Sequence, residues 1–333
     1  MKNVFWTLLL VICYMKIKAQ DVGLTQFFSS PIYLNPAFTG SVPQYRCNTA
    51  YRLQWSALAS PLETNIFSFD ARLANYNVGI GGIITHDRIA SLGLSSTTFG
   101  GVYSYVTETD QWMYRWGIQA GVIVRSVQFS RLTFGDQFLT GSPVTKEQFQ
   151  QATIGMPDVG AGFAAYSHRL WYGFAVHHLN QPDQSVISST SYQKERLPAR
   201  FSVHVGGKYA LHSQYIEVLP ALLLQHQGAS TLFDISNAFR YSDFMLGFSY
   251  KTSLSKPSSQ LSANRRAVAF FSNVKVESFI VGYSFDYGIG GNNAHYFGST
   301  HELTVVFVPK ASKRFKKKVR DNTRVHLPVY GFY

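Results

Sequence analysis

Several long segments of this chain alternate apolar and polar residues with a period of two. In segment 114–125, one face carries Tyr114, Trp116, Ile118, Ala120, Val122 and Val124, and the other carries Arg115, Gly117, Gln119, Gly121 and Arg125. Segments 200–209, 233–241 and 244–251 alternate as clearly, and residues 241–243 fit a tight turn between the last two. Because successive side chains of a strand point to opposite faces, the pattern predicts long strands with one apolar and one polar face.

A weaker form of this alternation recurs elsewhere and brings the predicted number of strands to about fourteen. The additional segments are 46–55, 65–73, 77–86, 94–105, 158–168, 170–177, 215–225, 266–273, 277–286 and 301–308. An even number of antiparallel strands of about 9 to 11 residues is typical of a bacterial outer-membrane barrel. A soluble β-sandwich is the alternative, but its strands usually run about 5 to 6 residues and its outer face is charged. Pro220 argues against a regular strand over 215–225, because proline has no N–H to donate.

The composition supports a membrane barrel. Charged residues make up 14% of the chain, whereas hydrophobic residues reach 46% and aromatic residues 15%. Soluble domains carry roughly 25% charged residues. Aromatic residues recur near the ends of the predicted strands, where they suit girdles at the membrane interface; examples are Tyr103, Tyr105, Tyr114, Trp116, Tyr209, Tyr241 and Tyr250. The sequence therefore predicts an all-β fold, a transmembrane antiparallel β-barrel of about fourteen strands.

Four regions are predicted along the chain. Residues 1–19 have the features of a cleaved signal peptide, since Met1-Lys2-Asn3 precedes an apolar run and Ala19 suits cleavage. Residues 20–45 are predicted to form an N-terminal periplasmic segment, residues 46–309 the outer-membrane barrel, and residues 310–333 a short basic periplasmic tail. Cys47 is the only cysteine left after removal of the signal peptide, which excludes an internal disulfide.

The N-terminal segment contains the most specific motif of the chain. Residues 26–40 read Gln-Phe-Phe-Ser-Ser-Pro-Ile-Tyr-Leu-Asn-Pro-Ala-Phe-Thr-Gly, and the motif residues are Gln26, Asn35, Pro36, Ala37 and Gly40. This block resembles the N-terminal motif of the PorP/SprF family, outer-membrane proteins of Bacteroidota associated with type IX secretion and gliding motility. The similarity continues at 51–55, Asp70, Gly81-Gly82, 283–286 and 301–303. It therefore covers nearly the whole mature chain.

The resemblance implies a non-enzymatic accessory role in type IX secretion. Members of the family are thought to hold a secreted adhesin, or its C-terminal targeting domain, at the cell surface and to contact periplasmic secretion components. Physically, the pair Asn35-Pro36 predicts a fixed turn, and Gly40 suits a positive φ. The block either closes the periplasmic mouth of the barrel or contacts a partner directly, and the sequence leaves both possibilities open.

Long connections and the basic tail are candidate contact surfaces. Connections 130–157, 179–198 and 252–265 are rich in polar and turn-forming residues, which predicts outward-facing recognition loops. Family members tend to end soon after the last strand, whereas this chain continues with Lys313, Arg314, Lys316, Lys317, Lys318 and Arg320. These residues are candidate contacts with an acidic periplasmic protein or the anionic envelope, and a solvated tail without a partner is the plainer alternative. The net charge of +12 does not predict binding to nucleic acid in an exported chain.

No motif for catalysis, a cofactor or a metal is found. The neighbours His177-His178 and His301-Glu302 point to opposite faces of a strand and cannot share a metal ion. The glycine-rich stretches 79–82 and 288–291 lack the following helix that a phosphate-binding loop needs. We therefore predict no cofactor and no enzymatic activity.

Two other functions remain open from the sequence. One is a passive anion-preferring pore whose lumen would be lined by Arg115, Gln119, Arg125, Arg200, Lys208 and Arg240. The other is an envelope scaffold that links the secretion machine to peptidoglycan.

Overall fold

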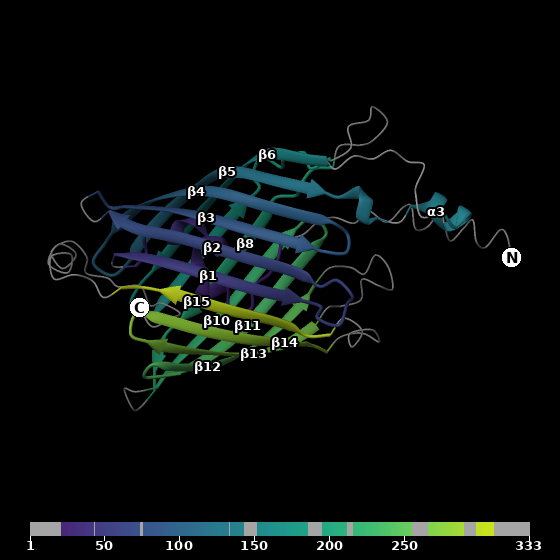
Figure 1. Cartoon of the computed structure of the whole chain (residues 1–333). Helices are drawn as coiled ribbons and strands as arrows, with labels where there is room; N and C mark the ends of the chain where they lie inside the picture. The colour runs from purple at the N-terminus through teal and green to yellow at the C-terminus, as the bar shows by residue number, and fades with distance from the viewer. Residues whose placement is uncertain are drawn as a thin grey trace.

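A computed structural model describes residues 21–42, 44–73, 76–132, 134–142, 152–185, 195–211, 216–254, 266–289 and 298–309. The predicted signal peptide, 1–19, and the predicted basic tail, 310–333, lie outside these residues. The described chain forms one antiparallel sheet that closes on itself, as Figure 1 shows. None of the helices in the described part is long and apolar enough to cross a membrane.

The barrel wall consists of successive strands that pair with their sequence neighbours. They are β1 (Tyr45–Gln54), β2 (Leu62–Leu73), β3 (Val78–Ile89), β4 (Leu94–Glu108), β5 (Met113–Val127), β6 (Ala152–Tyr166), β7 (Leu170–His177), β8 (Arg200–Gly207), β9 (Tyr209–Ala210), β10 (Ile216–Gln227), β11 (Ser230–Tyr241), β12 (Phe244–Ser253), β13 (Arg266–Val276), β14 (Phe279–Gly288) and β15 (Thr300–Phe307). The last strand, β15, pairs with both β14 and β1 and closes the barrel.

The predicted fold class is confirmed, a closed antiparallel barrel with 14 wall strands. The strands β8 and β9 both pair with β10 and form one wall strand interrupted at Lys208. Pro220 on β10 lies next to this interruption, between Val218, which pairs with Tyr209, and Ala221, which pairs with Gly206. The missing N–H of the proline therefore coincides with a break in the ladder, which removes the objection to a strand there.

The start of β6 differs most from the sequence expectation. Residues up to Pro157 were expected to form a loop, but β6 begins at Ala152. Pairing with β7 starts only at Ala161, so Pro157 lies on a stretch of β6 that no described strand flanks on that side. There Asn180 donates its side-chain amide to the carbonyl of Pro157 at 2.7 Å. A proline is tolerated at such an edge because its absent N–H breaks no ladder hydrogen bond.

The alternation of faces follows the sequence pattern. Trp116 and Phe248 on the outer face are both 47% exposed, whereas the inward-facing Arg115 is fully buried. The outer face is an almost continuous apolar surface with aromatic residues near the strand ends; Tyr103, Tyr105, Tyr209 and Tyr241 are all exposed there. Hydrocarbon cannot replace the water that charged groups need. An apolar outer face of this kind therefore fits the membrane interior.

The two ends of the barrel differ in their connections. One end, called here the short-turn mouth, carries connections 74–77, 109–112, 167–169, 211–215, 242–243 and 277–278, together with the start of β1. The other end, the long-loop mouth, carries the longest connections, 128–151, 178–199, 254–265 and 289–299. Within the first of these, the described residues form η3 (Phe129–Arg131) and α3 (Gly135–Thr140). This asymmetry is typical of outer-membrane barrels, which have short periplasmic turns and longer external loops.

Candidate functional site

The N-terminal residues 21–42 lie inside the barrel and are called here the plug. They contain three short helical turns, η1 (Phe27–Ser29), α2 (Pro31–Leu34) and η2 (Pro36–Phe38). Residues 20–45 were predicted as a separate segment on the periplasmic side, but the described part of that segment fills the lumen. Its apolar side chains could not stay in water without a large hydrophobic cost, and the lumen offers them a place to pack.

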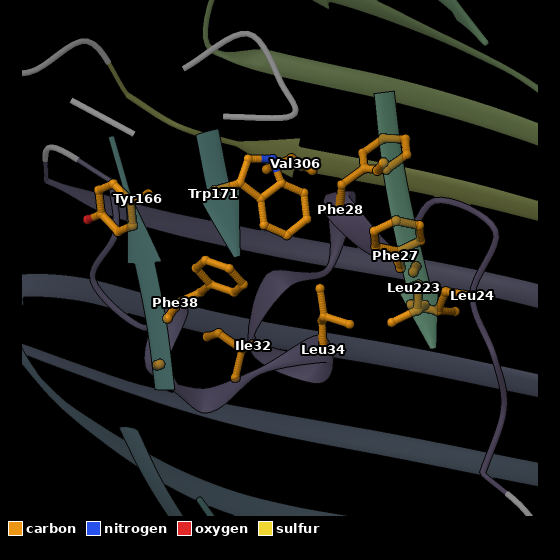
Figure 2. Packing of buried hydrophobic residues seen from close by; sticks show 14 of the residues in the cluster. Leu24, Phe27, Phe28, Ile32, Leu34, Phe38, Tyr166, Trp171, Leu223 and Val306 are labelled. Carbon is orange, nitrogen blue, oxygen red and sulfur yellow. The ribbon is translucent and has the colours of Figure 1, made fainter. Parts of the chain in front are cut away.

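The main hydrophobic core of the protein is the interface between the plug and the barrel wall. Figure 2 shows Ile32, Leu34 and Phe38 of the plug close to Trp171 of β7. The ring centroids of Phe38 and Trp171 are 6.1 Å apart. At the other side of the core, Phe28 packs against Phe271 of β13 with centroids 5.3 Å apart. The wall is therefore held to its own N-terminal segment by aromatic packing.

The plug runs along the barrel from one mouth to the other. At the long-loop mouth, the N–H of Asp21 donates to Gln227 at 2.7 Å, and the carboxylate of Asp21 lies 2.9 Å from Nη1 of Arg200. At the short-turn mouth, the N–H of Gly40 donates to Asp70 at 2.7 Å. The plug thus obstructs the lumen over most of its length.

A buried ionic cluster from β1, β14 and β15 binds the N-terminal part of the plug. The backbone N–H groups of Thr25 and Gln26 both donate to the carboxylate of Glu302, each at 2.9 Å. The Thr25 hydroxyl donates to Asp286 at 2.7 Å. Arg52 bridges the two carboxylates, 2.7 Å from Glu302 and 2.9 Å from Asp286. Hydrogen bonds to charged groups are stronger than neutral ones, so this cluster fixes the register of the plug.

Asn35 is the central polar contact of the Asn-Pro-Ala block. Its side-chain NH2 donates to the carbonyl of Phe163 on β6 at 2.9 Å and to the carbonyl of Phe174 on β7 at 3.2 Å, and it lies 3.1 Å from Nε2 of His204. Its side-chain oxygen accepts the N–H of Ala37 at 2.9 Å and caps η2. One amide therefore starts the turn and also joins the plug to three strands.

The wall beside the Asn-Pro-Ala block is lined by glycines. A Cβ on Gly117 of β5 would lie 2.5 Å from the carbonyl oxygen of Pro36 and closer still to the N of Ala37. A Cβ on Gly162 of β6 would lie 2.9 Å from Cγ of Asn35. Real Cβ contacts are longer than this, so the plug can approach the wall only where the wall has no side chains.

The C-terminal part of the plug is held by an arginine and by a glycine with a positive φ. Arg115 donates from Nε to the carbonyl of Ala37 at 3.0 Å and from Nη2 to the carbonyl of Thr39 at 2.6 Å. Gly40 has a φ of 65°, and a Cβ there would lie 2.6 Å from Cα of Gly79 on β3. Glycine suits this position both for its positive φ and for the close approach of the two chains.

A second ionic cluster lies at the long-loop mouth around His178, which follows β7. Nε2 of His178 is 2.8 Å from Asp21 of the plug, and Nδ1 is 2.8 Å from Asp158 of β6. Burial lowers the pKa of His178, but the carboxylates of Asp21 and Asp158 outweigh it and raise the pKa to about 9. A cationic His178, together with Arg200, therefore binds Asp21 at neutral pH.

The lumen-facing cations that could have lined an anion pore instead bind other parts of the chain. Arg115 and Arg200 bind the plug. Arg125 donates to Gln184 at 2.6 Å, and Lys208 and Arg240 both pair with Glu217. Within the described residues, no group of three or more His, Cys, Asp or Glu side chains could hold a metal ion.

The structure brings all five predicted motif residues into the plug. Gln26, Asn35 and Ala37 are fully buried, and Pro36 and Gly40 pack against the wall. The predicted tail contacts, 313–320, lie outside the described residues. Reasoning from the sequence missed the partners of the plug on the wall, namely Arg52, Asp158, His178, Asp286 and Glu302. For all of them except His178, which follows β7, the signal was a charged side chain on the inward face of a strand, because such a side chain needs a buried partner.

The chain matches the model of one protein family. Residues 16–307 match the family model described as type IX secretion system membrane protein PorP/SprF. No curated protein matches the sequence. Among solved structures, the outer membrane protein Omp33 of Acinetobacter baumannii is similar with a TM-score of 0.46 and 9% identity, over 81% of this chain and 99% of that one. The monoaromatic hydrocarbon channel TodX, as a deltaS2 mutant, gives a TM-score of 0.48 and 11% identity over 84% and 93% of the two chains.

Proposed function

Because this chain belongs to the PorP/SprF family of type IX secretion system membrane proteins, we propose that it is an outer-membrane accessory protein that holds a secreted adhesin at the cell surface. It would bind either the secreted adhesin as a whole or the C-terminal targeting domain of the adhesin. The long-loop mouth would face the cell surface, and the short-turn mouth would face the periplasmic secretion components. Surface display in gliding motility is the cellular setting that the family implies.

The observation that carries this proposal is the plug. A barrel meant as a passive pore needs a hydrated passage, but here the lumen cations bind the plug, a loop or Glu217. A barrel whose lumen is filled by the plug leaves its two mouths as the surfaces for recognition. The longest connections all leave the wall at one mouth, which suits that mouth to a large partner.

The motif residues act in this proposal from inside the barrel. Asn35, Pro36 and Ala37 are enclosed by β5, β6 and β7 and close the lumen instead of presenting a surface to a partner. Gly40, next to the short-turn mouth, sets the path by which the chain leaves the plug and enters β1. A periplasmic partner would therefore meet the Gly40 end of the plug and the short turns.

Surface display of the adhesin tests the proposal. A strain without this protein should lose most of its cognate adhesin from the surface, as measured by antibody labelling of intact cells. Complementation with the full chain should restore it. Full display in the deletion strain, with the adhesin gene expressed normally, would defeat the proposal.

The basic tail requires a separate experiment. Truncation after Lys310 removes the cationic residues 313–320. If the tail contacts acidic periplasmic components, the truncated protein should copurify with less of them at low salt, because surface charge attraction is screened by salt. Unchanged copurification would leave the tail without this role while the adhesin proposal still stands.

A further inference from the structure

A hydrogen-bonded serine and histidine lie on the outer wall of the barrel at the long-loop mouth. Oγ of Ser299 is 2.9 Å from Nε2 of His301. Nδ1 of the same ring is 2.8 Å from the hydroxyl of Tyr283 on β14. His301 lies on β15 and Ser299 just before it, and β15 is the neighbour of β14 in the wall (Figure 1). This is the spacing in which a histidine, oriented by a third group, can accept the proton of a serine.

Connection 55–61, between β1 and β2, holds Ser299 in this position. The N–H of Ser56 donates to the carbonyl of Ser299 at 3.0 Å, and the hydroxyls of the two serines are 3.1 Å apart. Gly298 has a φ of 71°, and a Cβ there would lie 2.6 Å from the N of Ala57. The glycine therefore allows connection 55–61 to pack against Ser299, which limits the freedom of the serine.

The pair faces the membrane and not the lumen. His301 alternates with the buried Thr300 and Glu302, whose side chains point inward. Its neighbours across the sheet are Leu53 on β1 and Phe285 on β14. Exposed apolar residues surround it on the outer face, including Tyr51, Tyr283, Tyr287 and Leu303. His301 is also the second residue of β15, so the pair lies at the end of the wall, where aromatic girdles meet lipid headgroups.

We propose that Ser299 and His301 form a nucleophilic pair that cleaves an acyl ester of a membrane lipid. This activity would be independent of the secretion role. Its detection would overturn the prediction of no enzymatic activity. Lipid esters lie at the depth of the headgroup boundary, so the substrate would reach the serine by lateral diffusion along the outer wall. The plug and the lumen take no part.

The proposed reaction has two stages. Oγ of Ser299 attacks the ester carbonyl carbon while Nε2 of His301 takes the hydroxyl proton. The ester C–O bond then breaks, His301 returns the proton to the leaving alcohol oxygen, and the acyl group stays on Ser299. A water molecule, with His301 as its base, next hydrolyses the acyl-serine to a fatty acid and restores the hydroxyl. Tyr283 is a positioning residue, since its phenol oxygen accepts Nδ1–H and keeps Nε2 free for the serine.

A purely structural role for the pair makes a different prediction. If the hydrogen bonds only joined connection 55–61 to β15, replacing Ser56 or Ser299 would have similar effects, because the two serines bond to each other. Ser56 has no hydrogen bond to His301 among the described contacts, so a catalytic role makes Ser299 the sensitive position. Ser56→Ala keeps the backbone N–H that supports Ser299 and removes only the Ser56 hydroxyl, so it is the matched control for Ser299→Ala.

Covalent labelling of the purified full chain tests the proposal. An alkyl fluorophosphonate forms a bond to an activated serine oxygen with loss of fluoride, and mass spectrometry locates the adduct. The wild type should be labelled at Ser299, Ser299→Ala should fall to background, and Ser56→Ala should stay within about threefold of the wild type. His301→Gln should react roughly 100-fold more slowly or worse, as expected for loss of a general base.

A lipid substrate provides the second measurement. Vesicles of phosphatidylethanolamine should release fatty acid with the wild type and with Ser56→Ala, and not with Ser299→Ala. The shift of the folded barrel on unheated gels checks that each variant is folded. A folded wild type that is neither labelled at Ser299 nor releases fatty acid above the Ser299→Ala background would overturn the proposal. Equal loss in Ser56→Ala and Ser299→Ala would overturn it as well, in favour of the structural role.

Discussion

Replacing Gly117 by alanine should loosen the plug without disturbing the barrel wall. Gly117 faces the lumen on β5, and a Cβ there would lie 2.5 Å from the carbonyl oxygen of Pro36 and closer still to the N of Ala37. These are backbone atoms, so no side chain can rotate away to make room. The Asn-Pro-Ala block must shift by about 1 Å, which also weakens the hydrogen bonds of Asn35 to the carbonyls of Phe163 and Phe174.

The size of the effect follows from the cost of overpacking. Adding one methyl group to a tightly packed site typically costs about 1 to 3 kcal/mol. If most of this cost falls on the seated plug, the equilibrium ratio of seated to unseated plug decreases by roughly 5-fold to 150-fold. Gly101→Ala is the matched control, because Gly101 faces outward on β4 and a Cβ there would meet only the carbonyl oxygen of Ala120, at 3.8 Å.

Current recordings in planar bilayers measure the occupancy of the plug. The wild type and Gly101→Ala should be closed almost all of the time, and Gly117→Ala should open more often by the same factor of roughly 5 to 150. A variant lacking residues 21–42 gives the open reference. If Gly117→Ala is folded and as silent as the wild type while the reference conducts, the glycine-lined wall does not control the seating of the plug.

Three further changes probe other parts of the structure. Glu302→Gln should lower stability by about 3 to 5 kcal/mol, because it leaves Arg52 without one buried carboxylate and weakens the bonds to Thr25 and Gln26. Thermal unfolding on gels measures this loss of stability. A loss no larger than that of Glu277→Gln, in a turn, would contradict the prediction. The attachment of the N-terminal end of the plug should depend on pH through His178, which faces Asp21, Asp158, Arg200 and His177. The pKa of His178 in the folded protein, about 9, lies above the ordinary histidine value of 6.5, so the stabilisation is complete below about pH 6.5 and is lost as the pH rises through about 9. Proteolysis of the N-terminus should increase over that range, and an unchanged profile in His178→Gln would exclude this histidine. Phe248→Lys on the outer face should cost about 2 to 4 kcal/mol in bilayers, against about 0 to 1 for Tyr241→Lys near the interface; equal values in urea titrations would argue against lipid around Phe248.

The alternation of side chains was sufficient to predict the barrel. Each predicted segment corresponds to a strand because every residue of a wall strand has only two environments, lipid or lumen, and period two in the sequence records that choice directly. Trp116 and Phe248 could be assigned to the outer face on this basis alone. The boundary of β6 was misplaced because proline usually ends a strand, and only the position of the neighbouring strands shows that Pro157 lies at a tolerated edge.

The place of the N-terminal segment was decided by the tertiary structure. Its sequence has no period that distinguishes a segment inside the lumen from one beside the barrel, since both would be short, apolar and turn-rich. Its partners lie far away in the sequence: Asn35 binds strands more than a hundred residues later, and Thr25 binds β14 and β15 near the end of the chain. The wall could be predicted without a structure, because it depends on local alternation. Closure of the lumen depends on which inward-facing charges and glycines meet when the first and last strands pair, and only the closed barrel brings those residues together.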